Sequence, residues 1–173
     1  MSKIWLNIVG IGEDGVDGLS PTARAAINSS DILIGGARHH ALTDTIKVER
    51  LTWPSPFDAM IETIEKLRGK QVCVLVTGDP GWFSAGVKIA SQFKSDEVCV
   101  HPHVSAFQLA ASRMDWALQD TVTLTVHGRP IQTIVPDIAP GALLLLLTRD
   151  PETHAQIASQ QEQQVLGHNR ITA

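Results

Sequence analysis

The sequence lacks the features typical of secreted, membrane-spanning and nucleic-acid-binding proteins. Only two cysteines occur, Cys73 and Cys99, without a Cys-x-x-Cys motif or a zinc-finger spacing. The longest purely apolar run, residues 142–147, is far shorter than the roughly 20 residues that span a bilayer. Asp and Glu outnumber Lys and Arg by 18 to 14, and no basic cluster is available for DNA or RNA. We expect a cytoplasmic protein with two buried thiols, no membrane segment, no nucleic-acid partner and no bound metal.

The 173 residues, 43% of them apolar, are enough for a well-formed core. Short runs of Val, Ile and Leu alternate with longer amphipathic stretches, which is typical of strands buried on both faces with helices between them. This pattern predicts an α/β fold. The expected strands are 3–9, 31–35, 47–51, 71–77, 97–100, 121–126 and 142–147, and the expected helices are 21–28, 56–68, 84–93, 105–113 and 151–164.

The alternation lapses between Met114 and Asp120. We place a domain boundary there, with one α/β half over residues 1–116 and a second over residues 117–173. The second half has only two expected strands, which are too few for an independently stable parallel sheet. We therefore expect this half to be incomplete, with more sequence downstream.

A glycine loop, residues 10–15 (GIGEDG), follows the first expected strand. Its three glycines have the spacing of the dinucleotide-binding G-x-G-x-x-G fingerprint. In that fingerprint the helix begins within the glycines, whereas Pro21 delays the helix start here to about Ser20. The acidic residues of the loop and Asp17 would also oppose a pyrophosphate. The loop is therefore either a tight turn or an acidic ligand-binding loop at the carboxyl edge of a parallel sheet.

A second turn, residues 77–84 (TGDPGWFS), follows the expected strand 71–77. Its glycines allow a close backbone approach, Asp79 supplies an acceptor, and Trp82 and Phe83 supply an apolar face. Gly-Asp-Pro-Gly is also a sequence that commonly forms a turn without binding a ligand. If the turn binds a ligand, the combination suits a cationic, adenine-bearing molecule better than a phosphate-rich one.

Histidines accompany two further strand ends. Residues 101–106 (HPHVSA) place Ser105 at a helix N-cap, and the sequence supplies no third ligand that would make His101 and His103 a metal site. The pair His39-His40 is interpreted as a solvated pair at a helix start. No spacing indicates a nucleophile activated by a base, so covalent catalysis is not expected.

Taken in order, the motifs at 9–15, 18–21, 78–80, 105–106, 116–120 and 127–130 resemble those of the tetrapyrrole methylase family. The resemblance implies two α/β halves with mostly parallel sheets and S-adenosylmethionine in a cleft between them. It is strongest to members that methylate C5 of a precorrin in cobalamin (vitamin B12) biosynthesis. It also implies a homodimer, and those members carry a separate C-terminal module for C15 methylation and decarboxylation, of which this sequence has no trace.

The resemblance also implies roles for single residues. The cofactor would contact Thr77, Gly78, Asp79, Trp82, Ser105, Ala106 and His127. The loop with Gly10, Gly12 and Gly15 would face the tetrapyrrole, whose carboxylates would be met by Arg38 and Arg129. A base for the proton released on methylation could be Asp14, Asp17 or His103, which the sequence does not rank.

Other functions stay open at this point. The same fold could methylate a different precorrin carbon or a ribosomal RNA ribose, although the acidity of the chain disfavours RNA. A nucleotide-dependent oxidoreductase could use the glycine loop, and a non-catalytic ligand-binding domain would fit an incomplete second half.

Overall fold

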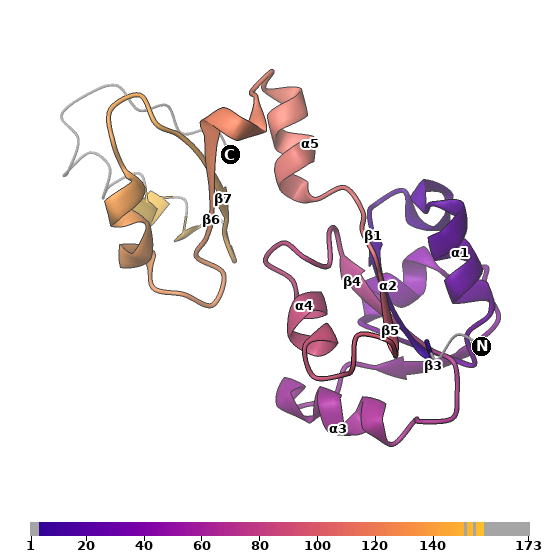
Figure 1. Cartoon of the computed structure of the whole chain (residues 1–173). Coiled ribbons are helices and arrows are strands. Elements are labelled where there is room, and N and C mark those ends of the chain that lie inside the picture. The colour runs from indigo at the N-terminus through magenta and orange to yellow at the C-terminus, as the bar shows by residue number, and fades with distance from the viewer. Residues whose placement is uncertain (1–3, 151, 154, 158–173) are drawn as a thin grey trace. The chain divides into compact units, whose positions relative to one another are not determined.

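The computed structural model describes residues 4–150, 152, 153 and 155–157. The chain divides into two compact units, of which the first ends at Ser105 and the second begins at Ala106 (Figure 1). The division thus precedes the helix that starts at Ala106, whereas the lapse in periodicity places it after that helix. Each unit is described by itself.

The first unit is built on a five-stranded, fully parallel sheet with the strand order β3-β2-β4-β1-β5. Its central strands, β1 and β4, pair from Leu6 opposite Val72 to Ile11 opposite Thr77. All five strands overlap ranges that the sequence predicts, although β1 continues through Gly10 and Ile11, which the sequence assigns to the glycine loop. They are β1 (Leu6–Ile11), β2 (Ile32–Gly35), β3 (Glu49–Thr52), β4 (Val72–Thr77) and β5 (Val98–His101).

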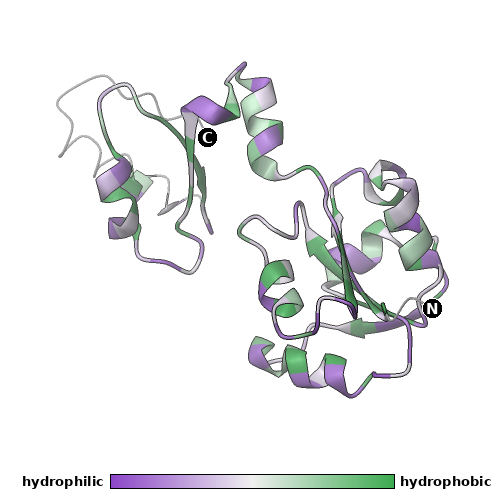
Figure 2. Cartoon of the chain, viewed as in Figure 1, coloured by the Kyte–Doolittle hydropathy of each residue, from purple (hydrophilic) through white to green (hydrophobic). Residues whose placement is uncertain are grey.

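Helices cover both faces of this sheet, which explains the near-continuous apolar runs of its strands. On one face α3 (Met60–Glu65) and α4 (Ala85–Ala90) pack against alternate residues of β1, β2 and β4. On the other face lie α1 (Pro21–Asn28) and α2 (Ala37–Leu42). Figure 2 shows the apolar strands between helices whose outer faces are hydrophilic.

The helix starts follow local capping chemistry. The Ser20 hydroxyl accepts a hydrogen bond from the Ala23 amide at 3.2 Å, and Pro21 fills the first turn, so α1 has its predicted bounds. The expected helix 56–68 is instead a 3-10 turn, Phe57–Ala59, followed by the shorter α3. The sequence indicates a helix start near His39 but no range for α2, and it does not predict the 3-10 turn Gly15–Gly18, because both elements are short and begin at or next to a glycine.

The second unit contains α5 (Ala106–Arg113) and a parallel pair of strands, β6 (Thr121–Thr125) and β7 (Leu143–Leu147). Two 3-10 segments, Leu118–Asp120 and Ile131–Asp137, flank β6. Val126, Ile134 and Ile157 form a small buried core in this unit. Of the expected helix 151–164, the described residues 152, 153 and 155–157 are helical, and the rest lies outside the described residues.

Both cysteines are free thiols inside strands. Cys73 in β4 is buried as predicted, and burial raises the pKa of its thiol far above the ordinary range. Cys99 in β5 is only half-buried. Among the described residues, no helix is both long and apolar enough to cross a membrane.

One arginine ties β3 to the end of α2, and its removal gives a first prediction. The guanidinium of Arg50 donates to the carbonyl oxygens of Thr43 at 2.6 Å and Ile46 at 2.8 Å, and to Thr43 Oγ1 at 3.0 Å. Replacing Arg50 by Met is expected to lower the free energy of unfolding by about 2 kcal/mol, because part-buried oxygens lose their charged donor. Urea unfolding measures the change.

The matched control is Lys66→Met, which removes a positive charge from an exposed ion pair with Glu62 on α3. Exposed pairs of this kind contribute little, so this variant is expected to unfold like the wild type. Equal losses in the two variants would contradict the assigned role of Arg50.

Candidate functional site

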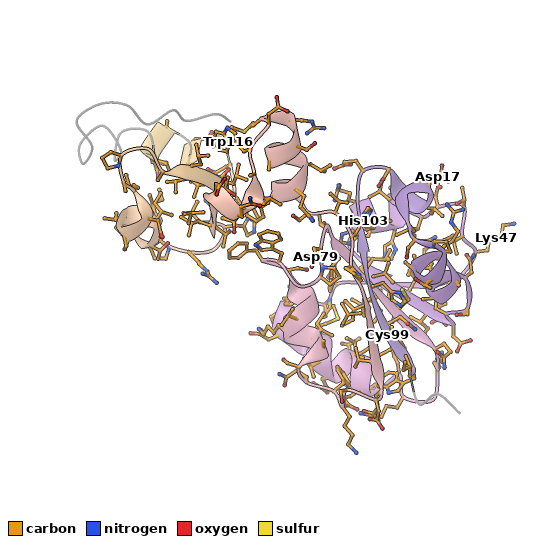
Figure 3. The ribbon with its side chains drawn as sticks, turned by 45° about the horizontal axis from the view of Figure 1, so that its top comes forward. Asp17, Lys47, Asp79, Cys99, His103 and Trp116 are labelled. Carbon is orange, nitrogen blue, oxygen red and sulfur yellow. The ribbon has the colours of Figure 1, made fainter. Side chains whose placement is uncertain are left out.

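Three sequence motifs meet at one edge of the five-stranded sheet. Strand β1 lies between β4 and β5, and all three run parallel, so the segments that follow them leave the sheet on the same side. A Cβ placed on Gly10 would lie 2.1 Å from the Gly78 carbonyl oxygen and 2.8 Å from His103 Cβ. Gly10 is therefore the point at which the glycine loop comes into close contact with the turn 77–84 and with the segment around His103. Figure 3 shows the labelled side chains of Asp79 and His103 at this edge.

The turn 77–84 is shaped by its own carboxylate. Asp79 Oδ1 accepts a hydrogen bond from the Gly81 amide at 2.6 Å, and the Gly78 amide donates to the Ile11 carbonyl oxygen at 2.9 Å. Gly78 has a φ of 63° and Phe83 a φ of 48°. A positive φ is unusual for an aromatic residue and stores strain, which is common in ligand-binding segments. Phe83 is 43% exposed, so its ring is accessible.

Thr77 is the centre of a hydrogen-bond network with residues that are distant in the sequence, and no local pattern predicts it. Its Oγ1 accepts from Arg38 Nη1 at 3.2 Å and lies 3.0 Å from His39 Nε2. The Gly36 amide donates to His39 Nδ1 at 3.1 Å, so the proton of the neutral His39 ring is on Nε2 and points to Thr77. Because Oγ1 accepts both bonds, its own proton can be donated to a ligand.

The interpretation of His39-His40 as a solvated pair is wrong. His39 is 8% exposed and its ring packs edge-on against Trp53, with 6.1 Å between the centroids. The His40 Nε2 atom lies 3.1 Å from the Leu51 carbonyl oxygen. The signal that could have placed them is Gly36 directly after a buried strand, where it caps α2 and fixes the direction of His39.

Arg38, the expected partner of a substrate carboxylate, is bound within the site. Besides Thr77, its guanidinium donates to the carboxylate of Glu13 in the glycine loop. The side chains of Arg38 and Glu13 are 43% and 80% exposed. A negatively charged ligand would therefore have to compete with Glu13 for Arg38, a pairing that no local sequence pattern indicates.

The three candidate bases occupy different surroundings. His103 Nε2 lies 3.5 Å from Asp14 Oδ1, so these two are brought together. Asp17 instead pairs with Arg24 at 3.2 Å, and its side chain is 96% exposed. Figure 3 shows Asp17 away from His103. Proximity to the other motifs thus favours Asp14 and His103 over Asp17.

His101 and His103 do not face one site. His101 Nε2 donates to Asn7 Oδ1 at 3.0 Å, and burial lowers the pKa of His101. Among the described residues, no group of three or more His, Cys, Asp or Glu side chains is arranged to hold a metal ion.

The remaining candidates lie on either side of the division between the units. Ser105 is buried at the end of the first unit, and Ala106 begins α5 of the second. His127 and Arg129 follow β6 in the second unit, and both are exposed. The His127 amide donates to Thr125 Oγ1 at 3.1 Å, which fixes the backbone of this turn.

The buried state of His39 predicts a pH dependence of stability. Burial, followed by the charges of Arg38 and His40, lowers the pKa of His39 from its ordinary value. The folded chain therefore binds fewer protons at this site than the unfolded chain, and stability present above pH 6.5 is lost as the pH falls through the folded pKa. We expect His39→Gln to lose less stability than the wild type between about pH 7 and about pH 5.

Urea unfolding at both pH values measures this difference. His101 contributes a dependence of the same sign, because its pKa is lowered too. The His39→Gln variant should therefore keep part of the pH dependence, and an undiminished slope would show that His39 is not the responsible group.

Comparisons with known proteins concern nearly the whole chain. Residues 6–167 match the family model described as Tetrapyrrole (Corrin/Porphyrin) Methylases. A precorrin-6Y C(5,15)-methyltransferase (decarboxylating) from Sinorhizobium sp is 40% identical over 169 residues, which cover 97% of this chain and 41% of that protein. A cobalt-precorrin-7 C(5)-methyltransferase from Salmonella typhimurium is 32% identical over 124 residues, covering 72% of this chain and 62% of the relative.

A solved structure shares the fold. The precorrin-6Y methylase of Archaeoglobus fulgidus superimposes with a TM-score of 0.66 over 90% of this chain and 78% of its own. The two sequences are 18% identical, so this likeness concerns the fold alone. The present chain spans 41% of the Sinorhizobium relative, and the activities in that protein's name belong to a longer protein.

Proposed function

Because the chain belongs to the tetrapyrrole methylase family, as its motifs predicted, we propose that it transfers a methyl group from S-adenosylmethionine to C5 of a precorrin in cobalamin biosynthesis. Two relatives support the choice of carbon, because both names include C5. Those names differ in the substrate, precorrin-6Y in one and cobalt-precorrin-7 in the other. The proposal covers both corrinoids and assigns neither C15 methylation nor decarboxylation to this chain.

The observation that carries the proposal is the meeting of the glycine loop and the turn 77–84 at Gly10 and Gly78. The turn offers what a positively charged, adenine-bearing cofactor needs, namely the Asp79 carboxylate, the Thr77 hydroxyl proton and aromatic side chains. These residues fit S-adenosylmethionine, which supplies an electrophilic methyl group when bound. We propose Thr77, Gly78, Asp79 and Trp82 as its contacts in the first unit.

The remaining contacts that the resemblance implies are retained as proposals. Ser105 and Ala106 would contact the cofactor, as would His127 of the second unit. The glycine loop would face the macrocycle, and Arg38 and Arg129 would bind its carboxylates, because bidentate arginine–carboxylate pairs combine charge with direction. We also propose that the chain forms a homodimer and acts in the cytoplasm.

Methyl transfer requires little from the protein beyond placing the methyl donor and the macrocycle correctly. Methyl transfer to an electron-rich ring carbon needs an in-line approach and exclusion of water, and correct orientation alone can account for much of the acceleration. No covalent intermediate with the protein is required. The chain's own contribution is therefore to hold the macrocycle, shield it and accept a proton.

Mass spectrometry tests the proposal. The chain is incubated with methyl-labelled S-adenosylmethionine and either the metal-free or the cobalt-containing precorrin, and we expect one labelled methyl group at C5. A parallel titration compares S-adenosylhomocysteine with NADH. Binding of NADH without binding of S-adenosylhomocysteine would replace the proposal by a nucleotide-dependent oxidoreductase, and binding without methyl transfer to either precorrin would favour a non-catalytic domain.

A further inference from the structure

His103 presents a buried hydrogen-bond donor at the edge of the sheet. Its side chain is only 10% exposed, and the Val104 amide donates to Nδ1 at 2.7 Å. The proton of the neutral ring is therefore on Nε2. Within the described part of the chain, Nε2 is buried and has no hydrogen-bond partner. Such atoms are rare in folded proteins, so this donor calls for an explanation.

The carboxylate of Asp14 is an acceptor close to this donor. Its Oδ1 lies 3.5 Å from His103 Nε2, a distance at which a small movement completes a hydrogen bond. The side chain of Asp14 is 57% exposed, so solvent and a ligand can reach its carboxylate. A buried donor and an accessible carboxylate thus face each other beside the glycine loop.

Two glycines leave the space that the Asp14 carboxylate occupies. A Cβ on Gly12 would lie 2.7 Å from Asp14 Oδ1 and 3.1 Å from His103 Nε2. A Cβ on Gly18 would lie only 1.9 Å from Asp14 Oδ2. Any side chain at either position would displace the carboxylate, so both glycines are explained by the placement of Asp14.

Arginines engage the acids on either side of Asp14. Glu13 pairs with Arg38, and Asp17 pairs with Arg24 at 3.2 Å. Asp14 instead lies beside the ring of His103. Of the three acids, Asp14 is therefore the one placed beside a buried donor.

We propose that Asp14 accepts the proton which the macrocycle loses on methylation, and that His103 is a positioning residue which holds the Asp14 carboxylate through Nε2–H. The proposal rests on the proposed function. In the reaction a π-electron pair of the ring carbon forms the new C–C bond, and the electrons of the broken S–C bond stay on sulfur. The macrocycle then carries an additional positive charge, which it loses by giving a proton to Asp14. Asp14 returns this proton to solvent.

The tautomer of His103 is the reason why Asp14, and not His103, is assigned as the proton acceptor. Its Nδ1 lone pair already accepts the Val104 amide proton, and Nε2 already carries a proton, so the ring offers no lone pair to the macrocycle. It can donate to Asp14, however, and such a bond orients the carboxylate. His103 therefore acts through Asp14.

Kinetics of paired variants test the proposal. Asp14→Asn keeps the shape of the side chain but removes the proton acceptor, so kcat should fall at least about 100-fold. The KM for the precorrin and the Kd for S-adenosylhomocysteine should change less than about threefold. Asp44→Asn, at an exposed acid of the same unit, is the matched control and should behave like the wild type. An Asp14→Asn variant with unchanged kcat would overturn the assignment.

Variants of His103 test the positioning role. His103→Ala removes the donor that holds the Asp14 carboxylate, so kcat should fall while the KM for the precorrin changes little. His103→Gln supplies an amide N–H in its place and should restore most of kcat. A role in folding alone would change the yield or stability of both variants without lowering kcat at constant KM and without rescue by glutamine, and that result would overturn the proposal.

A measurement without substrate keeps this inference separate from the proposed function. Nitrogen NMR of histidine-labelled wild-type chain should show the His103 proton on Nε2, with a signal that shifts in Asp14→Asn. If the wild type methylates no precorrin, the proposed function fails, and the NMR result still decides whether Asp14 and His103 interact. A proton on Nδ1 would overturn the arrangement.

Discussion

Replacing Asp79 by Ala is expected to weaken the binding of S-adenosylhomocysteine by at least about tenfold and to reduce precorrin methylation accordingly. Two losses combine in this variant. The Gly81 amide loses its acceptor, Asp79 Oδ1 at 2.6 Å, so the turn 77–84 relaxes. Under the proposed function, the site also loses the carboxylate that would face the positively charged cofactor. Isothermal titration calorimetry measures the binding, and methyl-labelled cofactor measures the transfer.

The variant Asp79→Asn separates the two losses. Its amide oxygen can still accept from the Gly81 amide, whereas its charge is gone, so we expect an affinity between those of the wild type and Asp79→Ala. Asp58→Ala is the control, because Asp58 is an exposed acid of the same unit that pairs with Lys88 at 3.2 Å. Equal affinities in Asp79→Ala and Asp58→Ala would contradict the cofactor role of the turn.

Replacing Gly10 by Ala is expected to have the largest effect on stability. The added Cβ would lie 2.1 Å from the Gly78 carbonyl oxygen, 2.8 Å from His103 Cβ and 2.9 Å from Pro80 Cδ. The first of these is a backbone atom of the residue that follows β4, and the amide of this residue donates to the Ile11 carbonyl oxygen at 2.9 Å, so the oxygen cannot move away without disturbing the sheet edge. We expect a loss of about 3 kcal/mol or more in the free energy of unfolding, together with loss of S-adenosylhomocysteine binding.

Gly69→Ala provides the comparison. Gly69 has a φ of 94° but no atom within 4 Å of the added Cβ, so this variant suffers conformational strain without a clash. Its expected cost is about 1 kcal/mol, and its cofactor binding should be that of the wild type. If both variants lose the same stability, the close approach at Gly10 is not what requires glycine there.

Much of the first unit could be predicted because its signals are local in sequence. The apolar run of residues 72–76 needs two covered faces, and Ser20 with Pro21 fixes the start of α1 through contacts within a few residues. Parallel strands place their carboxyl ends together, so the order of motifs along the chain also indicated where a ligand site would lie.

The parts that escaped prediction depend on partners distant in sequence. His39 looks like a surface histidine until β4 brings Thr77 within 3.0 Å of its ring. Asp14, Asp17 and His103 could not be ranked, because only the fold brings the segment after β5 to the glycine loop while leaving Asp17 with Arg24. Arg38 was assigned to substrate alone, whereas Glu13 and Thr77 already bind it.

The sequence by itself determined the α/β class, the seven strands and the family, because strand burial, capping and motif order are recorded in neighbouring residues. The tertiary structure decided which side chains meet. It brought Gly10 against Gly78 and Asp14 towards His103, and it joined Arg38 and His39 to Thr77. The physical reason is that hydrogen bonds and steric contacts depend on distances of a few ångströms, which the packing of the whole sheet sets and no local pattern records.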